Sequence, residues 1–322
     1  MRYAWRVVGT GEVVIGIDVG GTKTVCRLAN HDGQVLAESL GPGANLQSTG
    51  ELQAEKVLHQ VIVDVTRQTP QWPAVVCLGM AGVDRPGDAA VVRNILYRLV
   101  PRSQVVVVND ALIALEAGLA GAPGVVIIAG TGSIAYGRNR EGLAARAGGW
   151  GYVLGDEGSG YWLGRQALRA VVRSADGRGP YTSMTPLVLE HFGASRPQEL
   201  VKAIYAGTFQ PSTVAAIASL VDASADEGDA TALQLLDTGA RELGLAARSV
   251  CDAISLPHGP VLLAGGIFKV APRMRQRVVA HLTGRRQGMV VTPLQEAPVA
   301  GATWLACAAL RGTLVLPTYL DA

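Results

Sequence analysis

The segment VVIGIDVGGTKTVCRL, residues 13–28, consists of an apolar β-branched run, a turn rich in glycine and a second apolar run. Two such runs joined by a glycine turn predict neighbouring strands of a β-sheet. A third run, residues 34–38, follows the turn signal His31-Asp32-Gly33. The segment therefore predicts a three-stranded meander.

The same arrangement occurs again further along the chain. Its runs are residues 125–129, 134–137 and 143–146, and the turn Gly130-Thr131-Gly132-Ser133 joins the first two. A chain of 322 residues exceeds the size at which one hydrophobic core usually keeps growing, so two lobes are expected. Because the meander is repeated, we expect the two lobes to share one architecture.

Strands alternate with helices between the two meanders, which predicts a mainly parallel sheet with covered faces. The expected elements there are helix 51–68, strand 74–79, helix 89–99, strand 104–108 and helix 111–119. Further on, the expected elements are helix 157–172, a largely helical region to residue 221, helix 229–254, strand 260–264, helix 267–282, strand 289–292 and helix 299–310. We expect an N-terminal lobe of residues 1–112 and a C-terminal lobe of residues 113–322 with a helical insertion. A helix near residues 297–312 is expected to pack back on the first lobe.

Composition narrows the class of protein. Hydrophobic residues make up 49% of the chain and charged residues 17%, with a mean hydropathy of +0.26, which indicates a well-buried globular protein. The net charge of +2 offers no electrostatic footprint for nucleic acid or a membrane surface. The four cysteines are far apart without metal-ligand spacing, and the first residues lack a signal-peptide pattern, so a cytoplasmic location is expected.

The first glycine turn has the chemistry of an anion site. Gly20 and Gly21 expose backbone N–H groups that can bind phosphate oxygens, and Thr22 and Lys23 add a hydroxyl and a cation. Asp18, at the end of the preceding strand, is expected to hold Mg²⁺ through water. The alternative is an ordinary hairpin turn without a ligand.

The second turn repeats this chemistry with Gly130, Thr131, Gly132 and Ser133. We expect the two turns to hold the β- and γ-phosphates from opposite lobes. The chain lacks the G-x-x-x-x-G-K-[ST] pattern of a P-loop, and it lacks a strand followed by G-x-G-x-x-G.

An Asn109-Asp110 pair stands where the strand 104–108 gives way to a helix. The carboxyl ends of strands face the ligand crevice in open α/β sheets, so Asp110 is the candidate catalytic base. The alternative is that Asp110 caps the helix. Gly265 and Gly266 follow another strand and are expected to lie flat against a nucleoside, or else to form a tight connection only.

The segment GGWGYVLGDEGSGYW, residues 148–162, combines glycines, aromatic rings and carboxylates. Aromatic faces cover the apolar side of a sugar ring, and carboxylates accept hydrogen bonds from its hydroxyls. Gly149, Trp150 and Asp156 are therefore candidate sugar-binding residues, with Asn45 as a further one. The alternative is a glycine-rich turn before a helix.

These motifs together resemble the acetate and sugar kinase, heat-shock chaperone and actin superfamily. Within it, they are similar to the N-acetylglucosamine kinase and BadF/BadG-type ATPase family. The resemblance implies a two-lobed, actin-like and ribonuclease H-like α/β fold, with a mixed five-stranded sheet and flanking helices in each lobe. It implies ATP and Mg²⁺ as cofactors, and Asn45, Asn109, Asp110, Gly149, Trp150 and Asp156 as the sugar site.

The implied activity is phosphoryl transfer from ATP to a hydroxyl of an amino sugar, foremost the 6-hydroxyl of N-acetylglucosamine. Glucosamine and N-acetylmuramic acid remain open as substrates, and a homodimer is expected. The zinc motif of the related ROK sugar kinases is missing, and the isolated cysteines disfavour the redox activators among the BadF-type ATPases. Two alternatives stay open, a regulatory ATPase acting on a protein partner and a filament-forming scaffold of the actin type.

Overall fold

The computed structural model describes residues 12–205, 210–284 and 288–320. They form two compact units. Unit 1 comprises the described residues up to Pro123, with Arg140–Gly142 and Leu294–Thr318, and unit 2 comprises the described remainder. The sequence predicted a first boundary at residue 112. Unit 1 instead extends to Pro123, because the helix before this residue packs on a helix from the end of the chain.

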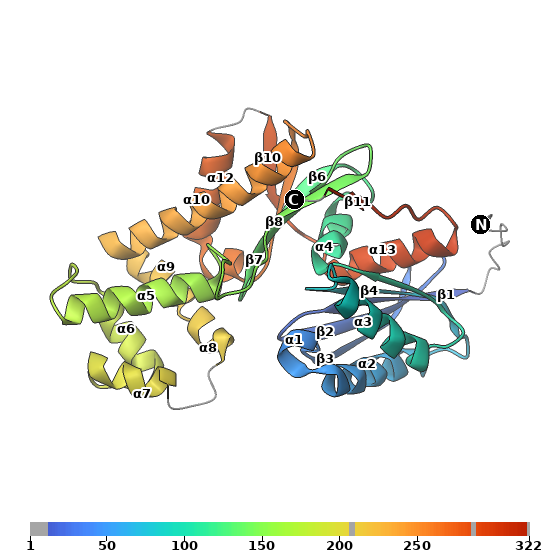
Figure 1. The fold of residues 1–322 in the computed structure, drawn as a ribbon, viewed down its shortest axis with the longest axis horizontal. Coiled ribbons are helices and arrows are strands. Elements are labelled where there is room, and N and C mark those ends of the chain that lie inside the picture. The colour runs from blue at the N-terminus through green and yellow to red at the C-terminus, as the bar shows by residue number, and fades with distance from the viewer. Residues whose placement is uncertain (1–11, 206–209, 285–287, 321–322) are drawn as a thin grey trace. The chain divides into compact units, whose positions relative to one another are not determined.

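Unit 1 contains a mixed five-stranded sheet in the order β3-β2-β1-β4-β5 (Figure 1). The strands are β1 (Val13–Val19), β2 (Lys23–Asn30), β3 (Val35–Pro42), β4 (Pro73–Met80) and β5 (Gln104–Val108). β1, β2 and β3 pair antiparallel, which confirms the predicted meander, whereas β1, β4 and β5 pair in parallel. The carboxyl ends of β1, β4 and β5 therefore share one edge of the sheet.

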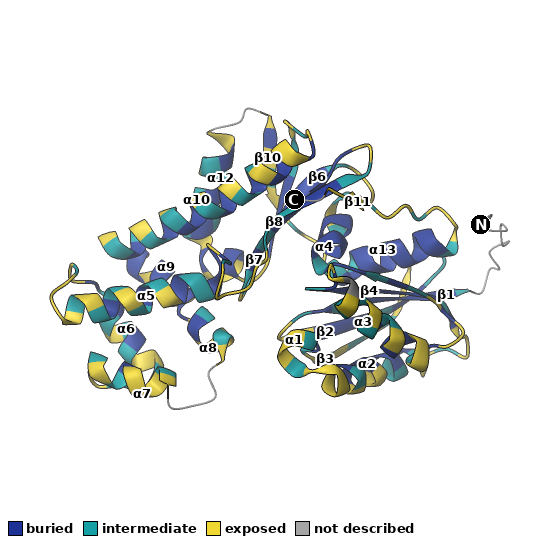
Figure 2. Cartoon of the chain, in the orientation of Figure 1, coloured by how far each residue is buried: buried dark blue, intermediate teal, exposed yellow. Residues whose placement is uncertain are grey.

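Helices cover both faces of this sheet. They are α1 (Leu46–Thr49), α2 (Glu51–Thr66), α3 (Pro86–Leu99), α4 (Asp110–Leu119) and α13 (Pro298–Leu310). α2 buries Ala54, Val57, Leu58, Val61, Ile62 and Val65 at helical spacing and packs on β2 and β3. α13 is almost wholly buried and contacts β1, β4 and α4 (Figure 2). An all-round apolar helix of this kind belongs in a core.

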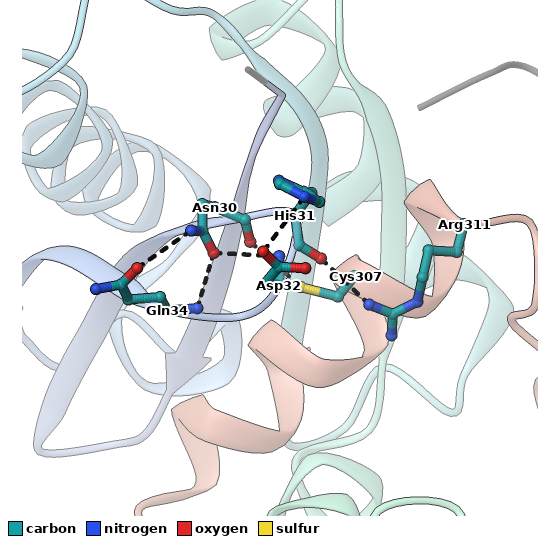
Figure 3. A network of polar contacts seen from close by, with 6 residues as sticks. All are labelled: Asn30, His31, Asp32, Gln34, Cys307 and Arg311. Atoms are coloured by element: carbon teal, nitrogen blue, oxygen red, sulfur yellow. Dashed lines mark hydrogen bonds and ion pairs between the residues drawn. The ribbon is translucent and has the colours of Figure 1, made fainter. Parts of the chain in front are cut away.

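The C-terminal end of α13 is tied to the turn between β2 and β3 (Figure 3). The Arg311 guanidinium donates to the His31 carbonyl oxygen at 3.2 Å, and the Cys307 Sγ lies 3.8 Å from the Asn30 carbonyl oxygen. The Asn30 side chain in turn accepts from the Gln34 backbone N–H at 2.9 Å. These contacts anchor a segment near the end of the sequence to the first meander.

Unit 2 contains a six-stranded sheet in the order β10-β9-β6-β7-β8-β11. The strands are β6 (Gly124–Ala129), β7 (Ser133–Arg138), β8 (Leu143–Gly148), β9 (Gly259–Ala264), β10 (Met289–Pro293) and β11 (Thr318–Tyr319). β6, β7 and β8 form the second antiparallel meander, and β6, β9 and β10 pair in parallel, as β1, β4 and β5 do. The expectation of five strands per lobe missed β11, because two residues carry no alternating pattern.

The helices of unit 2 are α5 (Gly160–Ala175), α6 (Met184–His191), α7 (Leu200–Tyr205), α8 (Pro211–Ala215), α9 (Ala218–Asp226), α10 (Ala230–Ala253), α11 (Ile267–Val270) and α12 (Pro272–Thr283), with a 3₁₀ turn at Pro197–Glu199. The long helix α10 packs on α12, α9, β7 and β8. None of the described helices combines the length and apolar content that crossing a bilayer requires.

Two predicted helix boundaries in unit 2 are wrong. The helix expected from Glu157 begins at Gly160, because the Ser159 hydroxyl caps it by accepting from the Trp162 backbone N–H at 3.1 Å. The helix expected over residues 267–282 is divided at Ala271, since Pro272 starts a new helix.

The contact between α13 and α4 gives a first testable prediction. A Cβ atom at Gly301 would overlap the Ile113 carbonyl oxygen, whereas a Cβ atom at Gly87, in the exposed first turn of α3, would meet nothing within 4 Å. We expect Gly301→Ala to lower the free energy of unfolding by about 1–3 kcal/mol, because forced overlap outweighs the gain of about 1 kcal/mol in helix propensity. Urea denaturation measures this change. The matched control Gly87→Ala should be neutral or stabilising, and equal effects of the two substitutions would contradict the packing argument.

Candidate active site

Three aspartates lie at the carboxyl-terminal edge of the sheet in unit 1. Asp18 is the penultimate residue of β1, Asp84 follows β4, and Asp110 begins α4 directly after β5. Because these strands are parallel neighbours, the topology brings their carboxyl ends together. Two of the three were predicted site residues, and Asp84 was not.

Asn109 connects the loop after β4 to the start of α4. Its Oδ1 accepts from the Ala111 backbone N–H at 2.7 Å, and its Nδ2 donates to the Asp84 Oδ2 at 2.8 Å. Only 6% of Asn109 is exposed. Asn109 is thus the N-cap of α4, so the helix does not require Asp110 as its cap. Asn109 was predicted from the sequence to bind the sugar. In the structure, both polar atoms of its side chain form hydrogen bonds within unit 1.

The electrostatic surroundings shift both Asp110 and Asp18 toward neutrality. Burial raises the pKa of Asp110 to about 7, helped by the charges of Asp18 and Asp84 and opposed by backbone N–H groups of the first helical turn. Burial also raises the pKa of Asp18 to about 6, opposed by the charge of Lys23. A carboxyl that titrates near neutral pH suits a general base, because it can both accept and release a proton there.

Asp84 is the functional candidate that sequence reasoning missed. A signal was present, because Asp84 follows the predicted strand 74–79 at the same sheet edge as the other two carboxylates. A turn separates Asp84 from the end of the strand, so its position beside the other two carboxylates was not evident from the sequence. Its hydrogen bond with Asn109 is seen only in the structure.

The first glycine turn forms a tight hairpin with an exposed tip. The Gly20 backbone N–H donates to the Lys23 carbonyl oxygen at 2.9 Å, while Gly21, Thr22 and Lys23 are exposed. A Cβ atom at Gly43 would overlap the Gly21 carbonyl group, so the following loop presses against the turn. The loop at Gly43 therefore supports the turn on one side, and the exposed residues of the tip remain accessible to solvent, as an anion site requires.

Asn45 lies in that same loop and caps the short helix α1. Its Oδ1 accepts from the Gln47 backbone N–H at 3.0 Å, and its Nδ2 donates to the Ala81 carbonyl oxygen at 3.2 Å. Ala81 belongs to the loop that leads from β4 to Asp84. The structure thus brings Asn45 close to the carboxylate edge of unit 1.

The second glycine turn lies in unit 2 at the start of α5. The Gly130 N–H donates to the Gly132 carbonyl oxygen at 2.9 Å. The first backbone N–H groups of α5 bind this turn as well, from Gly160 to Gly130 at 2.8 Å and from Tyr161 to Thr131 at 3.2 Å. Helix and turn are therefore held as one piece.

Asp156 contacts this turn through its side chain, which accepts a hydrogen bond from the Ser133 backbone N–H. It is only 6% exposed and has a φ of 58°, which is rare for a residue with a side chain. Burial raises the pKa of its carboxyl, although backbone N–H groups of Ser133 and Gly151 donate to it. A Cβ atom at Gly132 would lie 2.5 Å from the Asp156 Oδ2. Asp156 thus links the segment predicted for the sugar to the turn predicted for phosphate.

Trp150 is the exposed aromatic residue of this segment. It is 63% exposed, and the Arg146 guanidinium lies 5.0 Å from its ring centroid, a cation–π contact. Gly149 has a φ of 70°, which favours glycine at that position. The ring therefore presents an open face to solvent, although an exposed ring of this kind also needs no ligand to be stable.

The glycine pair after β9 lies beside the second turn. Gly265 has a φ of 103°, and a Cβ atom there would overlap backbone atoms of Ala129, the residue before Gly130. Around Gly266 the space is open. The structure therefore brings the predicted nucleoside and phosphate residues of unit 2 together.

The described part of the chain contains no metal site built from protein side chains alone. No group of three or more His, Cys, Asp or Glu side chains there could hold an ion. Mg²⁺ needs no such cage, since it commonly uses one or two carboxylates with phosphate oxygens and water. Asp18, half-buried beside the first turn, fits that role. All four cysteines are free and buried, as expected of small apolar side chains.

Two mixed sheets of the same topology, each with a glycine turn between its first two antiparallel strands, define an α/β protein of the sugar kinase and actin-like ATPase class. The chain belongs to the BadF/BadG/BcrA/BcrD ATPase family, whose model matches residues 15–306. An N-acetylmuramic acid/N-acetylglucosamine kinase of Clostridium acetobutylicum is 35% identical over 262 residues, covering 80% of this chain and 86% of that protein.

Two further relatives agree with this assignment. The N-acetyl-D-glucosamine kinase of Dictyostelium discoideum is 40% identical over 206 residues, covering 60% of this chain and 65% of that protein. The crystal structure of a putative N-acetylglucosamine kinase from Chromobacterium violaceum superposes with a TM-score of 0.77 at 28% identity, covering 92% of this chain and 99% of that one.

The raised pKa of Asp110 makes a prediction about stability. Between the ordinary pKa of 3.8 and the folded-state pKa of about 7, the folded protein keeps a proton that the unfolded chain loses, so rising pH favours unfolding. Asp110→Asn removes this penalty. We expect its stabilising effect to be about 2–4 kcal/mol larger at pH 8 than at pH 4.5 in urea denaturation. The control is Asp88→Asn, on the surface of α3. A gain that does not change with pH would refute the electrostatic argument.

Proposed function

We propose that the chain is an ATP-dependent amino-sugar kinase that transfers the γ-phosphoryl group to the 6-hydroxyl of N-acetylglucosamine. The observation that carries the proposal is the half-buried Asp110 carboxyl, whose pKa of about 7 suits it to receive the proton of an attacking hydroxyl. The kinases that are similar to this chain are named for amino sugars, which supports the choice of acceptor.

In the proposed reaction, Asp110 accepts the proton of the sugar hydroxyl while the oxygen of that hydroxyl forms a bond to the γ-phosphorus atom. The bond between that phosphorus and the β,γ-bridging oxygen breaks, and ADP leaves. Phosphoryl transfer depends mainly on positioning and charge stabilisation. Asp84 and Asn109 contribute by fixing the first turn of α4, and they are positioning residues in this scheme.

The nucleotide is assigned to the glycine motifs of both units. Backbone N–H groups of the turns Gly20 to Lys23 and Gly130 to Ser133, other than those of Gly20 and Gly130, which donate within their turns, bind the phosphates, and Gly265-Gly266 lies along the adenosine. Asp18 would hold Mg²⁺ through water, and the ion would supply positive charge that offsets the charge of the phosphate oxygens. The braced, exposed first turn and the rigid second turn support this assignment.

The sugar is assigned to Gly149, Trp150 and Asp156 of unit 2, together with Asn45 of unit 1, while Asn109 positions Asp110. The open face of Trp150 covers the apolar side of the ring. Burial of Asp156 under the second turn suits a carboxylate that holds a sugar hydroxyl and the turn together. Glucosamine and N-acetylmuramic acid are the other acceptors to be tested, and we propose that the enzyme acts in the cytoplasm as a homodimer.

The decisive experiment measures ADP release by the purified protein with N-acetylglucosamine, glucosamine, N-acetylmuramic acid and glucose. We expect release to depend on an amino sugar. Asp110→Asn should lower kcat by about a hundredfold or more, because a general base contributes about 10² to 10⁴ to the rate. ATP hydrolysis that no sugar changes would favour a regulatory ATPase and overturn the proposal, whereas full activity of Asp110→Asn would overturn only the identity of the base.

The role of Trp150 gives a separate prediction. We expect Trp150→Ala to raise the KM for N-acetylglucosamine about two- to tenfold with a smaller change in kcat, because stacking on a ring contributes about 0.5–1.5 kcal/mol. Trp150→Phe retains an aromatic face and should stay close to the wild type. If both variants keep the wild-type KM, the ring does not contact the sugar.

A further inference from the structure

Unit 2 contains a cavity of about 610 Å³ between α5, α7, α8 and the loop before α5. This volume lies in the range of small-molecule sites. Its lining is mainly apolar or aromatic and includes Leu168, Val172, Ile204, Tyr152 and Tyr161. The proposed mechanism uses backbone N–H groups in the first turn of α5, and it gives no role to the side chains that line this cavity.

Two arginines give the cavity its charge. Arg165 and Arg169 both line it and are four residues apart on α5, so their side chains lie on one face of the helix. Neither forms an ion pair or hydrogen bond with any residue in the described part of the chain. Among the described residues, the lining holds no aspartate or glutamate. Two guanidinium groups at an apolar wall are complementary to an anion that carries an apolar group.

The cavity shares its wall with the segment proposed to bind the sugar. Tyr152 and Val153 line it, and both lie between Trp150 and Asp156 in the sequence. The ring of Tyr152 packs on that of Tyr161 with centroids 4.8 Å apart, and the Tyr161 backbone N–H binds the second glycine turn. A sugar held by this segment would therefore lie next to the cavity that Arg165 and Arg169 line.

We propose that the cavity receives a carboxylate-bearing substituent of the sugar substrate, with Arg165 and Arg169 binding the carboxylate. This inference rests on the proposed function, and it assigns the residues that set the substrate range. N-acetylmuramic acid has the required chemistry, since it is N-acetylglucosamine with a lactyl ether at the 3-oxygen. The methyl group of that ether faces the apolar wall, and its carboxylate pairs with the guanidinium groups.

The test compares three acceptors in the ADP-release assay: N-acetylglucosamine, N-acetylmuramic acid and the methyl ester of N-acetylmuramic acid. We expect the wild type to phosphorylate the first two, with a KM for the ester about tenfold or more above that for the acid, because charge-assisted bonds are lost. The double variant Arg165→Gln/Arg169→Gln should raise the KM for N-acetylmuramic acid by a similar factor. Its KM for N-acetylglucosamine should stay within about twofold, because that sugar lacks the carboxylate.

Arg173→Gln is the matched control, since Arg173 lies on the same helix but outside the cavity. It should leave the kinetics of both sugars unchanged, and a thermal melt checks that all variants are folded. The inference is overturned if the wild type phosphorylates N-acetylglucosamine but not N-acetylmuramic acid. It is also overturned if the double variant treats acid and ester as the wild type does. If no sugar drives ADP release, the proposed function itself fails.

Discussion

The two hydrogen bonds of Asn109 hold the proposed catalytic edge of unit 1 in place. One bond fixes the first turn of α4, and the other fixes the loop after β4 through Asp84. The position of Asp110 follows from both, because its backbone is the first turn that Asn109 caps. A buried amide that satisfies two separate elements is costly to leave unpaired, so the arrangement is strongly specified.

Unit 2 reaches a similar rigidity through backbone contacts. Its second glycine turn receives N–H groups from the first turn of α5, and the Asp156 carboxyl receives N–H groups from the turn and from the segment after β8. Gly132 and Gly265 have no room for a Cβ atom, because a carboxylate oxygen and the Ala129 backbone occupy that space. At these two positions glycine therefore allows neighbouring atoms to approach the backbone closely. An ordinary glycine-rich hairpin does not require such close contacts.

Much of the fold was predictable, because the two meanders carry apolar runs separated by glycine turns, and the alternation of strands and helices follows from periodicity. Which of Asn109 and Asp110 caps α4 was not predictable. Both residue types cap helices, and only the observed hydrogen bonds assign the cap to Asn109. Asp84 and β11 were missed for a related reason, since a carboxylate in a turn and a two-residue strand acquire their meaning from partners that are distant in sequence.

Three carboxylates at one sheet edge repel one another, and their arrangement persists only if the elements that carry them resist separation. Each of those elements is clamped by a contact that leaves no space. Gly16 of β1, two residues before Asp18, lies against Thr303 of α13, and Gly79 of β4 lies against the side chain of Ile113, three residues after Asp110. The Ile113 carbonyl group in turn lies against Gly301 of α13. The buried helix α13 therefore stabilises an unfavourable electrostatic arrangement, and this explains why a helix so far along the sequence belongs to the unit that carries the carboxylates.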